Sequence, residues 1–270
     1  MKEIFQLSKP VVMGILNLTP DSFYDGNKYS NEKSILERVE QMLNEGAYMI
    51  DIGAFSSRPG AKFVSYEVER KRLIPHLKNI IKHFPGIIVS IDTYRHQIAE
   101  ESIAEGASII NDITAGNLDK KMFETIARLQ VPYIMMHMKG TPENMQKNPV
   151  YDDVIREITG FFKEKIDKLN QMGFEKIILD PGFGFGKTIT HNFEILKRLK
   201  EFNTLPYPLL IGISRKSMLY KLLDITPEKA LNATGIAHTI ALLNGAKILR
   251  VHDVKEAVEC IKITEKIKAI

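Results

Sequence analysis

The sequence contains a single cysteine, Cys260, and this excludes an internal disulfide bond. Cys260 lies in an apolar, helix-like stretch, so we expect a buried small hydrophobic side chain rather than a nucleophile. A lone cysteine also excludes a multi-thiolate zinc site and favours a reducing compartment. The seven histidines show no His-x-x-x-His spacing, and no Gly-x-Ser-x-Gly elbow is present. The sequence therefore predicts neither a dedicated metal cluster nor a serine nucleophile.

Long apolar runs and blocks of like charge are also missing. No stretch approaches the roughly 18 apolar residues that a membrane helix needs, and residues 1–10 lack the apolar core of a signal peptide. The net charge is +4, and the lysines and arginines are spread along the chain. We therefore expect a cytoplasmic protein that binds neither membranes nor nucleic acid. Its mildly basic balance suits anionic small-molecule substrates.

Short apolar runs rich in valine and isoleucine recur along the chain, and most are continuous rather than alternating. Such runs are typical of strands buried on both faces of a parallel sheet. Segments with helical spacing lie between them, as in residues 32–44, 67–82 and 230–244. A helix-ending glycine precedes the next strand at Gly46, Gly106 and Gly245. The predicted strands cover residues 11–18, 49–53, 87–93, 108–114, 133–138, 176–182, 209–214 and 248–254.

Eight strands that alternate with helices predict an α/β fold, a single (β/α)8 TIM barrel, with a doubly wound sheet as the alternative. A chain of 270 residues has the usual size of one such barrel, and no Pro/Ser-rich linker divides it. We therefore expect residues 1–270 to form one domain. The longest irregular segments follow the first, second and fifth strands, at the end of a barrel where catalytic loops lie.

Polar side chains end the predicted strands. A single Asp or Asn at such a position is more often a helix cap or a turn residue. A succession of acids, amides and cations is better explained by a rim that binds a polar, partly anionic ligand. His137, flanked by methionines, is left open between a packing residue and a ligand contact. The residues in order are Asn17, Asp51, Asp92, Asn111, His137, Asp180, Ser214 with Lys216, and Arg250 with His252.

The glycine-rich segment from Asp180 to Lys187 superficially resembles a phosphate loop. The Walker pattern requires a glycine five residues before its Gly-Lys pair, and Pro181 occupies that position. The glycines instead suit close approach of the backbone to a flat ligand, with Phe185 available for stacking. The alternative is a strand-to-helix turn with core phenylalanines.

Two basic motifs follow the last two strands. Arg215 and Lys216 stand where a helix is expected to begin, although cations are unfavourable at a helix N-terminus, and this conflict suggests a functional site. Alternation places Arg250 and His252 on one side of the last strand, beside a helix beginning near Asp253. That corner of a barrel often binds phosphate, although His252 could also be a satisfied core histidine.

These motifs together resemble the dihydropteroate synthases, a family of pterin-binding enzymes. Residues 13–26 resemble the opening signature of the family, and residues 51–61 resemble the second. The remaining motifs follow in family order, so the resemblance spans nearly the whole chain. They are residues 90–93, 110–112, 136–140, 180–187, 214–216 and 250–253.

The resemblance implies condensation of 6-hydroxymethyl-7,8-dihydropterin diphosphate with 4-aminobenzoate to 7,8-dihydropteroate and diphosphate in folate biosynthesis. It further implies early loss of diphosphate, capture of a pterin methyl cation by the amine, a Mg²⁺ cofactor, a homodimer and an enzyme of the kind that sulfonamides target. By resemblance, Asn17 binds the metal, and the catalytic residues are Asp92, Lys216 and Arg250. The substrate-binding residues are Asp51, Ser57, Arg58, Asn111, Asp180, Phe185, Ser214 and His252.

One departure from the family pattern lies in the second motif. The family usually has Gly-Gly-Glu-Ser-Thr, whereas this chain has Gly-Ala-Phe-Ser-Ser, so Phe55 replaces an acid and that acid's role is not carried over. A pterin-binding methyltransferase is the nearest alternative, but it handles no diphosphate. The Asn-Leu-Thr-Pro-Asp signature and the Arg250/His252 pair therefore disfavour it. A non-catalytic pterin-binding barrel is a second alternative.

Overall fold

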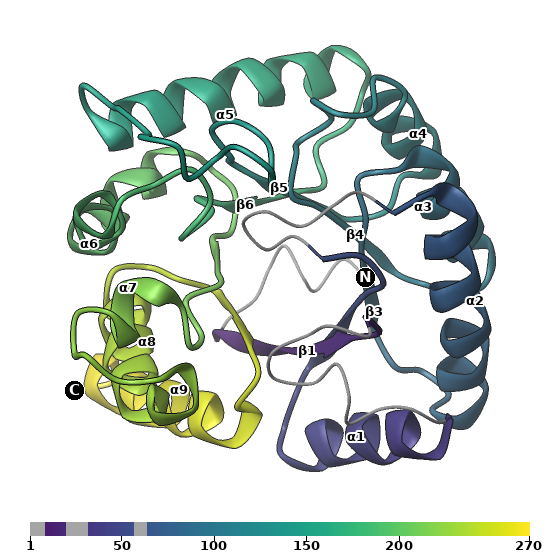
Figure 1. Ribbon diagram of the computed structural model, residues 1–270, viewed down its shortest axis with the longest axis horizontal. Coiled ribbons are helices and arrows are strands. Elements are labelled where there is room, and N and C mark those ends of the chain that lie inside the picture. Colours follow the sequence, from purple (N-terminus) through teal and green to yellow (C-terminus); the bar gives the residue numbers. More distant parts are fainter. Residues whose placement is uncertain (1–8, 20–31, 57–63) are drawn as a thin grey trace.

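The computed structural model describes residues 9–19, 32–56 and 64–270, and its strands form a ring enclosed by helices (Figure 1). The strands are β1 (Val11–Asn17), β2 (Met49–Gly53), β3 (Val89–Asp92), β4 (Ile109–Asp112), β5 (Tyr133–Met136), β6 (Ile177–Asp180), β7 (Leu210–Ile211) and β8 (Ile248–Val251). All eight predicted strands are present. The greatest shortening is in β7, which pairs with β8 at only two positions.

The strands are parallel and lie in the order β6-β5-β4-β3-β2-β1-β8-β7. The two ends of this order meet through a single bridge between Leu179 and Leu209, where the amide of Leu179 donates to the carbonyl of Pro208 at 2.9 Å. We call this junction the β6–β7 seam. Closure at the seam confirms the predicted barrel and rules out the open doubly wound sheet.

The helices follow the strands around the outside of the ring, and α7, α8 and α9 lie together on one side (Figure 1). The predicted helical segments agree with α1, α2 and α8 to within one residue at each end. The helices are α1 (Glu32–Asn44), α2 (Tyr66–His83), α3 (His96–Ala104), α4 (Met122–Leu129), α5 (Val154–Gln171), α6 (Ile189–Lys197), α7 (Ser217–Tyr220), α8 (Leu231–Leu243) and α9 (Val254–Lys268), with short 3₁₀ turns η2 (Leu199–Thr204) and η3 (Pro227–Lys229).

The interior of the barrel changes character along its axis. A fully buried apolar cluster closes one end, and it consists of Met13, Met49, Ile109, Ile134, Ile178, Leu210 and Ile248. Side chains alternate along a strand, so residues two positions further on face the same interior. At four strands those positions hold Asp51, Asn111, Asp180 and Arg250. The polar residues therefore form a layer directly above an apolar floor.

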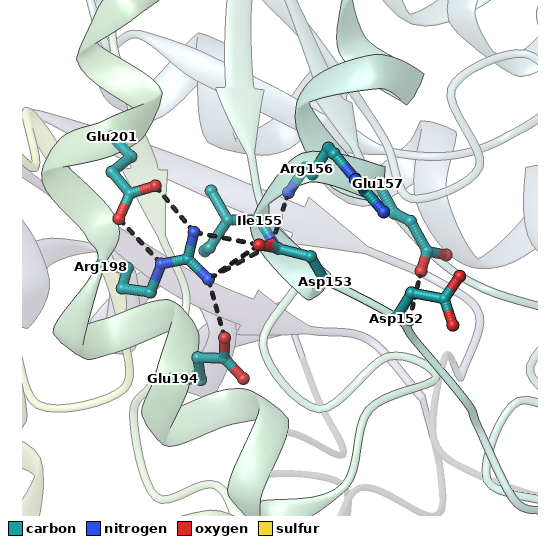
Figure 2. A network of polar contacts seen from close by, with 8 residues as sticks. All are labelled: Asp152, Asp153, Ile155, Arg156, Glu157, Glu194, Arg198 and Glu201. Carbon is teal, nitrogen blue, oxygen red and sulfur yellow. Dashed lines mark hydrogen bonds and ion pairs between the residues drawn. The ribbon is translucent and has the colours of Figure 1, made fainter.

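An ion-pair network ties α5 to the end of α6 on the outside of the barrel (Figure 2). Asp153 caps α5 by accepting from the amides of Ile155 and Arg156 at 2.9 Å, and it also pairs with Arg198 at 3.2 Å. Arg198 follows α6 and binds Glu194 and Glu201, at 2.8 Å each. We call these four charged residues, Asp153, Glu194, Arg198 and Glu201, the outer network.

The single cysteine of the sequence, Cys260, lies on α9. Cys260 is partly rather than fully buried, and burial raises the pKa of its thiol, which disfavours the nucleophilic thiolate. Within the described ranges, no helix has the length and apolar character required to cross a membrane.

Candidate active site

Asp51 lies at the centre of the polar layer and is fully buried. Asp51 and Ser90 occupy paired positions of β2 and β3, and the hydroxyl of Ser90 donates to Asp51 at 2.6 Å. Asn111 donates to the other carboxylate oxygen at 3.0 Å, and Arg250 Nε donates to it at 2.7 Å. A buried carboxylate is tolerated because its oxygens are bound in this way. We call Asp51, Ser90, Asp92, Asn111 and Arg250 the inner network.

Asp92 joins the inner network through a 3.0 Å bond from the guanidinium of Arg250 to Oδ2. Its other oxygen, Oδ1, is buried and has no partner among the described residues. Burial raises the pKa of Asp92 to about 8, although the charge of Arg250 opposes the rise. Asp92 is therefore mostly protonated at neutral pH. A buried oxygen without a partner is costly and indicates a place for a ligand.

Asp180 and Lys216 form the second part of the site, on the two sides of the β6–β7 seam. Burial raises the pKa of Asp180 and lowers that of Lys216 to about 8, while each charge opposes the shift of the other. Lys216 donates to the carbonyl of Phe183, and its nitrogen lies 4.4 Å from the centroid of the Phe185 ring. The structure thus brings together an acid, an ammonium group and an aromatic face.

Ser214 and His252 lie together at the carboxyl end of β8. The hydroxyl of Ser214 is 3.3 Å from Nδ1 of His252 and accepts from the backbone amide of His252 at the same distance. Burial, followed by the charge of Arg250, lowers the pKa of His252 to about 3, so the imidazole is neutral. Helix α9 begins at Val254 with Asp253 as its N-cap, as expected. Its free amides add to the positive character of this corner.

Arg215 and Lys216 are the two cations that precede the N-terminus of α7, and they have different roles in the structure. Arg215 makes a two-point ion pair with Asp253, at 2.8 and 2.9 Å, and donates to the carbonyls of Pro227 and Glu228. Its backbone has φ 52°, in the left-handed region. Arg215 therefore holds neighbouring loops together, whereas Lys216 belongs to the site.

Two of the three glycines in residues 180–187 make room for protein backbone, and close approach of this loop to a flat ligand stays a prediction. A Cβ on Gly182 would lie 2.0 Å from the carbonyl oxygen of His137, and one on Gly186 would lie 2.3 Å from that of Lys139. Both glycines have positive φ, 72° and 64°. These positions therefore require glycine, because the loop after β6 packs against the end of β5.

His137 is a packing residue in this structure rather than part of the polar rim. Its ring packs edge-on against Phe161, with centroids 5.0 Å apart, and its Nδ1 lies 3.0 Å from the ammonium of Lys187. Burial and the charges of Lys187 and Lys139 lower its pKa well below the ordinary value. These contacts favour the packing alternative for His137.

Phe55, the departure from the family motif, is buried in a small apolar cluster with Tyr94, Ile113 and Met136. Its ring meets Tyr94 edge-on, with centroids 5.2 Å apart. An apolar partner thus fills the position at which the family carries an acid. Two predicted substrate-binding residues, Ser57 and Arg58, lie outside the described residues.

Two contributors to the site were not assigned from the sequence. Ser90 was noted only as part of a motif, although its paired register with Asp51 could have indicated the contact. Arg38, on α1, donates to the backbone carbonyl of His252 at 2.6 Å. Helical spacing gives no signal for Arg38, because its partner is 214 residues away.

Asn17 is the predicted metal ligand at the end of β1. A Cβ built on Gly53 would lie 3.8 Å from Oδ1 of Asn17 and 3.6 Å from Oδ2 of Asp92, so both oxygens face the same neighbour. The described part of the chain contains no cluster of three or more His, Cys, Asp or Glu side chains that could hold a metal ion. The side-chain oxygen of Asn17 is a donor of the kind that Mg²⁺ accepts, and this ion takes few protein ligands where substrate phosphates and water supply the others.

Comparisons with known proteins agree with the site. The family model of the pterin binding enzymes matches residues 13–252. Dihydropteroate synthase of Escherichia coli (strain K12) is 44% identical over 261 residues, covering 96% of this chain and 92% of the relative. That of Bacillus subtilis (strain 168) is 39% identical over 259 residues, covering 95% and 88%.

Two solved structures extend this likeness to three dimensions. Yersinia pestis dihydropteroate synthase in complex with a sulfonamide drug has a TM-score of 0.94 and 42% identity, covering 98% of this chain and 96% of that one. Xanthomonas albilineans dihydropteroate synthase with 4-aminobenzoic acid has a TM-score of 0.90 and 35% identity, covering 98% and 95%. With its barrel, its inner network and these relatives, the chain belongs to the dihydropteroate synthases.

Proposed function

We propose that the dihydropteroate synthase activity of this chain is carried by the inner network together with Asp180, Lys216 and Phe185. The reaction joins 6-hydroxymethyl-7,8-dihydropterin diphosphate to 4-aminobenzoate and yields 7,8-dihydropteroate and diphosphate. The observation that carries the proposal is the buried Oδ1 of Asp92, which has no partner among the described residues and lies in the same carboxyl group that Arg250 binds. Such an oxygen is suited to a polar ligand inside the barrel.

The flat pterin would occupy the polar layer above the apolar floor. Asp180 would accept from the amino-pyrimidinone edge of the ring, because adjacent N–H donors match a buried carboxylate. Protonated Asp92 and the ammonium of Lys216 would donate to ring acceptors, with Asn111 as a further contact. These groups adjust the electron density of the pterin and are not required to pass a proton between them. Asp51 would act through Arg250 and Asn111, which it holds in place.

The diphosphate would point toward the carboxyl end of β8, where positive character is concentrated. Arg250, the N-terminus of α9 and the neutral imidazole of His252 supply donors there, and Ser214 orients that imidazole. Asn17 would hold Mg²⁺ together with the diphosphate oxygens, and the ion would neutralise charge on that group. Ser57 and Arg58 remain predicted contacts of the diphosphate and of the loop beside 4-aminobenzoate.

In the reaction, the bond between the pterin methylene carbon and the diphosphate oxygen breaks, and its electron pair leaves with the diphosphate. The amine nitrogen of 4-aminobenzoate then bonds to that carbon and loses a proton. Preorganised cations stabilise the departing negative charge, which is commonly the largest contribution to catalysis. We infer that the bond to diphosphate breaks first. This order suits 4-aminobenzoate, because an aromatic amine is a weak nucleophile and reacts more readily with a cation.

The test is diphosphate release by the purified protein, supplied with the pterin diphosphate and Mg²⁺, with and without 4-aminobenzoate. We expect release that depends on the amine, with one dihydropteroate formed for each diphosphate. Tight binding of the pterin diphosphate without turnover would instead support a non-catalytic barrel. Absence of binding would overturn the assignment of the site.

We also propose that the chain forms a homodimer through α8 and α9. Large apolar side chains are exposed on both helices, and Ile236 (56%) and Ile263 (60%) are examples. On α8 the residues Ile236, Ile240 and Leu243 recur at helical spacing, so they lie on one face. An exposed apolar face of this kind is typical of an interface. Sedimentation velocity should show a dimer, and Ile236→Lys should shift it toward the monomer.

A further inference from the structure

Lys187 is almost fully buried, with 2% of its surface exposed, and its ammonium lies inside the loop that follows β6. The nitrogen is 2.9 Å from the carbonyl oxygen of Gly182, 2.9 Å from that of Phe185 and 3.0 Å from Nδ1 of His137. The carbonyl oxygen of His137 is a fourth, longer neighbour at 3.3 Å. The loop is therefore wrapped around one cation.

The contacts of Lys187 indicate the protonation states of Lys187 itself and of His137. An ammonium group has three N–H donors, and three acceptors lie within 3.0 Å of the nitrogen. A neutral amine would direct its lone pair at one of these acceptors. Burial and the charge of Lys216 lower the pKa of Lys187 well below its usual value, whereas the charge of Asp180 and the three acceptors favour the charged form. His137 accepts at Nδ1 and therefore carries its proton on Nε2.

The same loop contacts both charged groups of the second part of the site. The amide of Gly182 donates to Oδ1 of Asp180 at 2.8 Å, and the carbonyl of Phe183 accepts from Lys216. The carbonyl of Phe185 itself accepts from Lys187. Three carbonyls of the loop thus bind two lysines, with Gly182 and Phe185 facing Lys187 and Phe183 facing Lys216. A displacement of the loop would move Asp180, Lys216 and the Phe185 ring together.

We propose that Lys187, with neutral His137 as its acceptor, is a positioning residue that holds the loop after β6 in the shape required to bind the pterin. Lys187 occupies the place that a bound cation takes in a cage of carbonyl oxygens. It does not touch the substrate. The inference rests on the proposed function, because it assigns Lys187 a role through Asp180, Lys216 and Phe185.

The test replaces Lys187 by alanine in the full chain and adds back a primary ammonium ion. We expect kcat/KM for the pterin diphosphate to fall about 100-fold, the size of effect expected when catalytic groups are displaced by about 1 Å. Propylammonium should restore a large part of this loss, whereas tetramethylammonium at equal ionic strength should restore none because it has no N–H donors. Lys176→Ala is the matched control, since Lys176 donates to the carbonyl of Gln130 outside this loop.

Two results would overturn the role of Lys187. One is a folded Lys187→Ala enzyme with unchanged kcat/KM, and the other is a loss that propylammonium does not reduce. Where Lys187→Ala does not fold, His137→Phe decides, because it keeps a ring but removes the acceptor at Nδ1. We expect it to raise KM for the pterin diphosphate, and an unchanged KM would contradict the proposal. The wild-type enzyme distinguishes the proposed function from the role of Lys187. If the wild type itself does not form dihydropteroate, the proposed function fails, whereas a loss seen only in the variants concerns Lys187.

Discussion

The inner and outer networks each join an arginine to carboxylates, but they are assembled in opposite ways. Arg250 is 199 residues from Asp51 and 158 from Asp92, so these residues meet only after β8 has paired with β1. Arg198 binds Glu194 and Glu201, which are four and three residues away, and only Asp153 comes from another element. The outer network therefore follows from helix geometry, whereas the inner network requires the whole fold.

Burial separates the two networks in energy as well. The carboxylates around Arg250 are buried, and removing charges from water costs more than a simple ion pair returns. The carboxylates around Arg198 are partly exposed, and each ion pair between exposed groups contributes little to the free energy of unfolding. A barrel that retains the costly arrangement at its centre does so for a ligand. The difference between the networks can therefore be tested by breaking each in turn.

The largest effect is expected for Arg250→Ala. The substitution leaves Asp51 without its cation and Asp92 without a donor, and breaking a buried pair in this way costs about 3–5 kcal/mol in the free energy of unfolding. It also removes charge stabilisation of the leaving diphosphate, so kcat/KM should fall by about 10²–10³-fold. Calorimetry and steady-state kinetics measure the two losses. Arg250→Lys keeps the charge and should recover part of the activity, and full activity in Arg250→Ala would contradict the role of the inner network.

A smaller loss, confined to substrate affinity, is expected for Asp180→Asn. The amide replaces a charged acceptor, and a hydrogen bond to a charged group contributes about 1.5–3 kcal/mol. Binding of the pterin diphosphate, measured by titration calorimetry, should weaken about 10- to 100-fold. Asp153→Asn in the outer network is the control, and its affinity should equal that of the wild type. Equal affinities for both variants would contradict the role of Asp180 in binding the pterin.

Asp92→Asn should reveal the inner network through pH. The folded-state pKa of Asp92 is raised from 3.8 to about 8, so the folded protein binds more protons than the unfolded chain between these values. The contribution of this carboxyl to stability is therefore fully present below pH 4 and is lost as the pH rises toward 8. The Tm of Asp92→Asn relative to the wild type should rise from pH 5 to pH 8. A difference in Tm that does not change with pH would mean that Asp92 is ionised throughout.

The smallest effect is expected for Arg198→Met. Its partners remain hydrated after the substitution, so Tm should fall by a few degrees at most and kcat should not change. The hydrogen bonds from Arg198 lower the pKa of Glu201, so the stability that they provide is present above the ordinary pKa and is lost as the pH falls through the lowered one. Thermal unfolding at pH 7 and pH 3 should show the difference from wild type shrinking in acid. The outer network thus loses its contribution toward acid, and Asp92 loses its own toward alkali.

The sequence allowed the barrel to be predicted because its signals are local. Continuous apolar runs marked β1 through β8, and glycines such as Gly46 and Gly106 marked the turns before the next strand. The polar rim could also be predicted, since Asp92, Asp180 and Arg250 stand at strand ends. The sequence could not show which acid binds which cation. It also gave no sign that Gly182 and Gly186 make room for carbonyl groups at the end of β5. Those facts depend on contacts between strands far apart in the chain, such as the carbonyl of His137 against Gly182.

The β6–β7 seam has a consequence for how ligand binding and folding are linked. The barrel has one bridge there, and Asp180 and Lys216 stand on its two sides. A pterin held by both residues would act as an additional rung across the weakest junction of the ring. Because a ligand that binds only the folded state stabilises it in proportion to the logarithm of its concentration, that stabilisation should be largest at the seam. The amide of Leu179, which donates to the carbonyl of Pro208 across the seam, would then show the greatest gain in protection from hydrogen exchange when the pterin binds.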